Sequence, residues 1–125
     1  MHMSVQKILV VDDEPQMRRV LRTSLIAHGY EVVEAASGEE ALNKLSTERY
    51  DCVLLDLNLP GLDGVETCRA IRASCQIPIV VVSIRDSEND KAAAREAGAD
   101  EYLMKPFGVE ELLSRIQAAS RSRSG

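Results

Sequence analysis

The chain has 125 residues, a formal net charge of −5 at pH 7, and 45% hydrophobic and 28% charged residues. That length suits one domain with a single core, and that composition excludes a disordered chain. The acidic balance does not favour nucleic-acid binding by charge. The sequence has neither a signal region nor a long apolar run, so we expect a cytoplasmic protein without a membrane span.

Short apolar runs alternate with amphipathic helical patterns along the whole chain. The runs predict strands at residues 7–11, 31–35, 52–55, 79–82 and 102–104. Helical spacing predicts helices at residues 16–28, 65–73, 88–97 and 109–120, and the capping box of Ser37 and Glu40 opens one more. Residues 121–125 have no apolar face and indicate a frayed end or a linker.

Five alternations of strand and helix, with nearly continuous apolar strands, predict a parallel α/β sheet covered by helices on both faces. The crossovers of such a sheet are right-handed, and for this number of strands we expect the order 2-1-3-4-5. The carboxyl ends of all the strands then lie on one edge of the sheet. Open α/β sheets bind their ligands at that edge.

Polar residues follow four of the five predicted strands. Asp12 and Asp13 follow the first strand, Asp56 the third, Ser83 the fourth and Lys105 the fifth. These strands are neighbours in the predicted order, so the five side chains are expected to converge. The second strand, at the edge of the sheet, contributes nothing obvious.

The residue types at these positions predict phosphoryl chemistry. Three carboxylates repel one another unless a cation lies among them, and oxygen ligands without clustered His or Cys favour Mg²⁺. An aspartate beside Mg²⁺ can attack a phosphoryl group and form an acyl phosphate. We therefore expect Asp56 to be the phosphoryl acceptor, with Lys105 and Ser83 binding the phosphoryl oxygens.

Other functions use similar pieces. Phosphatases and dehalogenases with an Asp nucleophile carry a second acid two residues later, where this chain has Asn58. A flavin- or dinucleotide-binding module needs a Gly- or Ser/Thr-rich phosphate loop after the first strand, whereas residues 12–16 read DDEPQ. Asp12 and Asp13 could also simply stabilise a helix N-terminus, but that explanation does not account for the convergence.

Four segments together resemble the receiver domain of two-component response regulators. They are VVDDE, LLDLNLPGLDG around Asp56, the serine after VVV, and GADEYLMKPFG. The resemblance covers residues 5–121, with 1–4 as a disordered leader and 122–125 as a tail or the start of a linker. It implies the flavodoxin-like (βα)5 three-layer sandwich. It also implies phosphorylation of Asp56 by a partner histidine kinase and no activity beyond self-catalysed phosphoryl acceptance and slow autodephosphorylation.

The resemblance also implies roles for single residues around the acceptor. Asp13, Asp56 and the backbone carbonyl of Asn58 would bind Mg²⁺, with Asp12 bound through water. Asn58 and Arg85 would border the path of the attacking water and tune how long the phosphate survives. Arg85 could either obstruct that water or orient it.

A second implied set of residues transmits the change. Ser83 and Lys105 would hold the phosphoryl oxygens, and Lys105–Pro106 would be a cis peptide. Tyr102 matches the aromatic switch position, expected to turn inward when Ser83 moves toward the phosphate.

Within the family, the C-terminal part resembles the winged-helix DNA-binding class, and the stretch SIRDSENDKAAAREAGADEY resembles regulators of potassium-transport operons. In that class the fourth helix, fifth strand and fifth helix form a homodimer face on phosphorylation. The charged residues of that face here would be Lys91, Arg95, Asp100, Glu101, Glu111, Arg115 and Arg121. DNA would be bound only through a C-terminal domain absent from this chain. The alternatives are a stand-alone receiver that signals by protein binding, or a degenerate receiver that acts as an interaction module.

Overall fold

The structure, a computed structural model, describes residues 6–124, in which five strands alternate with five helices. The predicted leader at 1–4 lies outside the described residues. The strands are β1 Lys7–Val11, β2 Glu31–Ala35, β3 Cys52–Asp56, β4 Ile79–Ser83 and β5 Glu101–Met104. The helices are α1 Pro15–Ala27, α2 Gly38–Thr47, α3 Gly64–Ser74, α4 Glu88–Ala97 and α5 Val109–Ser124. Within the described part of the chain no helix combines the length and hydrophobicity needed to cross a bilayer.

The sheet is parallel throughout, with the strand order β2-β1-β3-β4-β5. This order confirms the prediction, and it places β1, β3, β4 and β5 side by side. Val11 of β1 pairs with Leu55 of β3, and Asp56 at the end of β3 pairs with Val82 of β4. The residues that follow these positions therefore emerge at the same edge of the sheet.

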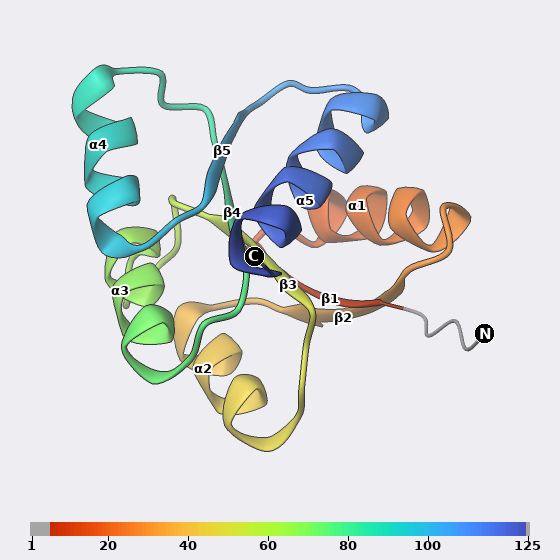
Figure 1. Ribbon diagram of the computed structural model, residues 1–125, viewed down its shortest axis with the longest axis horizontal. Coiled ribbons are helices and arrows are strands. Elements are labelled where there is room, and N and C mark those ends of the chain that lie inside the picture. Colours follow the sequence, from red (N-terminus) through yellow and green to blue (C-terminus); the bar gives the residue numbers. More distant parts are fainter. Residues whose placement is uncertain (1–5, 125) are drawn as a thin grey trace.

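Helices cover both faces of the sheet, as the apolar strands require. Figure 1 shows α1 and α5 on one side and α2, α3 and α4 on the other. One core cluster joins the sheet to α1 and α5 through side chains such as Leu25 and Ile116. The other joins it to α2, α3 and α4 through side chains such as Ala41 and Ile71. The result is the predicted three-layer sandwich, with a core on each side of β3.

Local signals in the sequence set the helix ends. The side chains of Ser37, Asp63 and Ser87 each accept a hydrogen bond from a backbone N–H in the first turn of α2, α3 and α4. Pro15 begins α1, where its missing N–H costs nothing. Gly98 ends α4 with φ of 113°, a left-handed conformation that glycine adopts without strain.

The last helix is longer than the sequence indicated, because α5 continues to Ser124 rather than ending near residue 120. The guanidinium of Arg123 in its final turn donates to Asp100 at 2.7 Å and to Gln76 at 2.8 Å. These contacts come from residues distant in the chain and stabilise a segment without an apolar face. The predicted end of the domain at residue 121 stays a prediction.

The three cysteines are free, and two of them belong to the core. Cys52 in β3 and Cys68 in α3 are buried, and burial raises the pKa of the first thiol to about 12 and of the second to about 11. Both thiols therefore stay protonated at neutral pH and act as small apolar side chains.

The close approach of α3 to the end of β3 generates a prediction about Gly64. A Cβ at this position would lie 2.3 Å from the Cα of Leu57 and 2.6 Å from the carbonyl oxygen of Asp56. Because backbone cannot yield as a side chain can, Gly64→Ala should lower the free energy of unfolding by about 2 kcal/mol in urea denaturation. In Gly108→Ala, where a Cβ would have no neighbour within 4 Å, the loss should be smaller. Equal losses would contradict this account.

Candidate functional site

Three aspartates meet at the carboxyl edge of the sheet. Asp12 and Asp13 directly follow β1, and Asp56 is the last residue of β3. One carboxylate oxygen from each of the three lies within 4.8 Å of the others. Asp12 is 2% exposed and Asp56 is 4% exposed, whereas Asp13 faces solvent. The structure thus brings together the three carboxylates that the sequence predicted.

Lys105 brings a positive charge to this cluster from the loop after β5. Its Nζ lies 3.3 Å from Oδ2 of Asp56 and 3.4 Å from Oδ2 of Asp12. Burial alone would lower the pKa of Lys105, but the charges of Asp56 and Asp12 outweigh it and raise that pKa above its usual value. Burial raises the pKa of Asp12, and the nearby charge of Asp56 acts in the same direction.

Backbone hydrogen bonds orient the two buried carboxylates. Oδ1 of Asp12 accepts from the N–H of Glu14 at 2.9 Å, and Oδ1 of Asp56 accepts from the N–H of Asn58 at 3.0 Å. The other oxygen of each carboxylate faces Lys105. Each side chain is therefore fixed by the loop that follows its own strand.

This arrangement suits a small divalent cation. Three carboxylates face a single ammonium group, so the described cluster keeps an excess of negative charge. All of its donor atoms are oxygens, which Mg²⁺ prefers. Asp12, Asp13 and Asp56 would hold the ion, and the loop that carries Asn58 lies directly beside them.

Ser83 and Arg85 form the next part of the site. Ser83, the last residue of β4, is fully buried, and its Oγ accepts from the N–H of Arg85 at 2.9 Å. The Arg85 guanidinium donates twice to Oδ1 of Asn58, at 2.6 and 3.1 Å. The two positions predicted separately to tune phosphate lifetime are therefore in direct contact.

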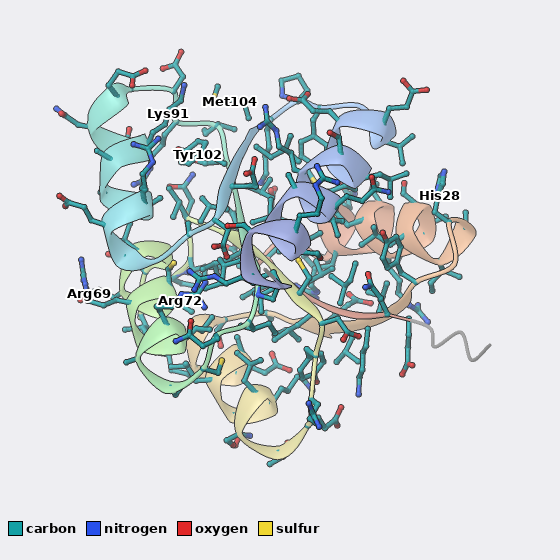
Figure 2. All side chains as sticks on the ribbon, in the orientation of Figure 1. His28, Arg69, Arg72, Lys91, Tyr102 and Met104 are labelled. Carbon is teal, nitrogen blue, oxygen red and sulfur yellow. The ribbon has the colours of Figure 1, made fainter. Side chains whose placement is uncertain are left out.

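Tyr102 of β5 joins the same group. Its hydroxyl donates to the carbonyl oxygen of Arg85 at 2.8 Å, and its ring packs against the core from a half-buried position. Figure 2 labels Tyr102 beside Lys91, and both line a hollow between α4 and β5. Arg85 thus links the predicted switch residues, Ser83 and Tyr102, to the loop that follows the acceptor. The Lys105–Pro106 peptide is cis, as predicted.

The predicted dimer-face residues lie on α4, β5, α5 and the turn before β5, and most of them pair within the chain. Arg115 contacts Glu101 at 3.0 Å and Glu111 at 3.8 Å, and Lys91 contacts Glu88 at 3.8 Å. Arg95 of α4 and Arg121 of α5 are exposed.

Asp100 stands apart from the other dimer-face candidates. Its side chain is only 4% exposed, and its carboxylate binds Arg72 at 3.0 Å, Arg123 at 2.7 Å and the N–H of Ile79 at 2.9 Å. No local pattern reveals this carboxylate as internal, because its partners lie 21 to 28 residues away in the chain.

Two features near the site were missed from the sequence. An open groove of about 340 Å³ beside Lys105 is lined by apolar side chains: Met17, Val20, Ile84, Pro106 and Phe107. Val20 is 59% exposed and Ile84 is 66% exposed, so the groove presents a patch of apolar side chains to solvent. The other feature is Arg18 of α1, whose guanidinium reaches the backbone of Asp12.

Comparison with known proteins identifies the class of this fold and site. The family profile described as the response regulator receiver domain matches residues 8–117, and the chain belongs to that family. It is therefore a receiver domain of a two-component response regulator, which confirms the resemblance noted in the sequence.

Relatives and solved structures agree with this assignment. The chain is 47% identical over 116 residues to the response regulator MprA of Mycolicibacterium vanbaalenii, covering 92% of this chain and 50% of that protein. It is 43% identical over 114 residues to the transcriptional regulatory protein KdpE of Mycobacterium tuberculosis, covering 91% and 50%. The chain spans about half the length of these relatives. The chemotaxis protein CheY4 of Vibrio cholerae has 35% identity and a TM-score of 0.88, covering 93% of this chain and 99% of that one.

The position of Lys105 generates a prediction about stability. In the absence of divalent ions, Lys105→Met should lower the free energy of unfolding by about 2 kcal/mol, because two buried carboxylates lose their cation. The same change should tighten Mg²⁺ binding measured by calorimetry, since a competing positive charge is removed. Lys91→Met, which removes a 3.8 Å surface pair with Glu88, should leave both values near wild type. Unchanged stability in Lys105→Met would refute the prediction.

Proposed function

We propose that Asp56 accepts a phosphoryl group from the phosphohistidine of a partner histidine kinase, and that Mg²⁺ is the cofactor. The observation that carries this proposal is the convergence of three aspartates and Lys105 around a buried carboxylate at the end of β3. Membership of the receiver family supports it, because receivers of response regulators are partners of histidine kinases. The exposed apolar groove beside Lys105 supports a protein donor, which needs a surface next to the acceptor.

The transfer follows from the chemistry of the acceptor. A carboxylate oxygen of Asp56 attacks the phosphorus, the new P–O bond forms, and the P–N bond to the donor histidine breaks. The electron pair of that bond stays on the imidazole nitrogen. Bound Mg²⁺ would supply charge neutralisation for the transferred oxygens. Lys105, already 3.3 Å from Asp56, supplies a second positive charge to the same oxygens.

The response begins at Ser83 and reaches the surface through Tyr102. The Ser83 hydroxyl can donate to a phosphoryl oxygen while its Oγ accepts from the N–H of Arg85. Movement of Ser83 toward the phosphate displaces Arg85, whose carbonyl binds the Tyr102 hydroxyl. Tyr102 lines the hollow between α4 and β5, so the change reaches the α4–β5–α5 face.

We propose that this face forms a homodimer on phosphorylation and that the output is transcriptional. DNA would be bound only through a C-terminal domain absent from this chain. The chain spans about half of relatives that include a transcriptional regulatory protein, which supports this output. We propose that the domain acts in the cytoplasm and that its only chemistry is its own phosphorylation and slow autodephosphorylation.

The acceptor is tested by incubation with acetyl phosphate and Mg²⁺, followed by intact mass measurement. Wild-type protein should gain one phosphoryl group, and chelation should prevent the gain because the oxygens of the group then lack their main counter-charge. Asp56→Asn should keep the fold and lose the modification, since its shape is retained and its nucleophilic charge is lost. Asp86→Asn, an exposed change outside the acidic cluster, should be modified as wild type is.

Sedimentation of the same samples tests the output. A shift from monomer to dimer with phosphorylation would support the DNA-binding regulator class. Modification without dimerisation would contradict the proposed output and favour a stand-alone receiver that signals by protein binding. Modification of Asp56→Asn at the wild-type rate would refute the acceptor itself.

Arg85 should control the lifetime of the phosphate. We propose that its guanidinium, which donates to Asn58 in the loop after the acceptor, obstructs the approach of water to the phosphorylated carboxylate. Arg85→Ala should therefore accelerate autodephosphorylation about fivefold, equivalent to about 1 kcal/mol in the barrier. The decay of phosphoprotein after removal of acetyl phosphate measures this rate. Arg69→Ala, which removes an exposed arginine paired with Glu66 of its own helix, is the control. An unchanged rate in Arg85→Ala would disprove the assignment.

A further inference from the structure

We propose that Arg18 of α1 is a positioning residue for the divalent-cation site, and that Glu34 of β2 holds Arg18 in place. The proposal rests on the proposed function, because it concerns the affinity of the acidic cluster for Mg²⁺. The edge strand β2 shows no site residue in its sequence. Its contribution is indirect and passes through a single guanidinium group.

The geometry of Arg18 carries this inference. Its Nη1 donates to the backbone carbonyl oxygen of Asp12 at 2.7 Å, and its Nε donates to Oε1 of Glu34 at 3.0 Å. The Arg18 side chain is only 17% exposed, so these bonds are partly shielded from water. One planar group thus ties the end of β1 to β2 and to the first turns of α1.

The bonds of Arg18 help to fix the turn that carries two of the proposed cation ligands, Asp12 and Asp13. The N–H of Asp12 donates to the carbonyl of Ala35, its Oδ1 accepts from the N–H of Glu14, and its carbonyl accepts from Arg18. The next residue, Asp13, faces solvent. The path of this backbone therefore sets the position of its carboxylate in the cluster. Without Arg18, the Asp12 carbonyl loses its charged partner, and the peptide between the two aspartates loses one of the hydrogen bonds that orient it.

The negative charge of Glu34 explains why this residue, rather than a neutral acceptor, pairs with Arg18. An unpaired guanidinium next to the acidic cluster would oppose the binding of a second cation. Glu34 offsets that charge while it orients the group, so Arg18 positions the ligands without weakening their attraction for Mg²⁺. A lysine could not replace it, because the three donors of an ammonium group all come from one rotatable nitrogen, whereas Arg18 donates from Nε and Nη1, two nitrogens held in one plane.

The chain provides a matched control in Arg22, one helical turn further along α1. Arg22 also pairs with Glu34, through Oε2 at 3.9 Å, but its side chain is 56% exposed. Among residues 6–124 it has no hydrogen bond to the Asp12 loop. Arg18→Ala and Arg22→Ala each remove one positive charge that pairs with Glu34, but only Arg18→Ala also removes the hydrogen bonds to Glu34 and to the Asp12 carbonyl.

The experiment measures the Kd for Mg²⁺ by calorimetry on the whole chain, without a phosphodonor. Arg18→Ala should weaken binding about 10- to 100-fold, the range found when partners of metal ligands are removed. Arg22→Ala should change the Kd less than twofold, and Arg18→Lys should resemble Arg18→Ala. At saturating Mg²⁺ the rate of phosphorylation of Arg18→Ala by acetyl phosphate should return near the wild-type value, since Asp56 and Lys105 are untouched.

The outcomes separate this inference from the proposed function. Equal Mg²⁺ affinity in Arg18→Ala and Arg22→Ala, with wild-type binding intact, would overturn the role of Arg18 alone. A loss of stability in urea without a change in Kd would show a purely structural role and would also overturn it. If Arg18→Ala does not fold, Arg18→Lys decides the question by the same comparison. A wild-type chain that binds no Mg²⁺ would refute the proposed cofactor and this inference together.

Discussion

The site depends on the mutual repulsion of three carboxylates that the fold forces together. One oxygen from each carboxylate lies within 4.8 Å of the others, at an edge of the sheet where two of the three side chains are buried. Lys105 offsets part of this charge, and backbone N–H groups fix the carboxylates that it contacts. The remaining negative charge attracts cations, and in the proposed function a bound Mg²⁺ would offset the charge of the phosphoryl oxygens. A site that was electrostatically satisfied in the resting protein would have no such affinity.

Close packing behind the site keeps the repelling groups from moving apart. α3 begins against the backbone just after Asp56, at a point where Gly64 leaves no room for a side chain. α2 begins in the same way, because a Cβ on Gly38 would clash with the side chain of Thr67. The loop that carries Asn58 is therefore confined between two helix starts and the end of β3. Because the loop is tightly packed, the side chains of the site stay in place as long as the fold itself is intact.

The sequence predicted most of the fold because its signals were local. Apolar runs located the strands, capping residues located the helix starts, and alternation specified the parallel sheet and hence the convergence at Asp56. The residues it missed act through contacts between distant segments. Arg18 reads as an ordinary exposed helix residue until β2 is placed beside it. The extension of α5 to Ser124 depends on contacts of Arg123 with Asp100 and Gln76, which lie more than twenty residues away in the chain. Helical periodicity in the sequence carries no information about such contacts.

The carboxylate of Asp100 joins several elements at the amino edge of the sheet, opposite the edge that carries the acidic cluster. It binds the start of β4, Arg72 of α3 and Arg123 at the end of α5, so three elements are fastened at one point. These contacts lie at the amino end of β4, opposite the carboxyl edge of the sheet that carries the three aspartates. One buried carboxylate therefore joins α3, β4 and α5 at the end of the molecule that is remote from the acidic cluster.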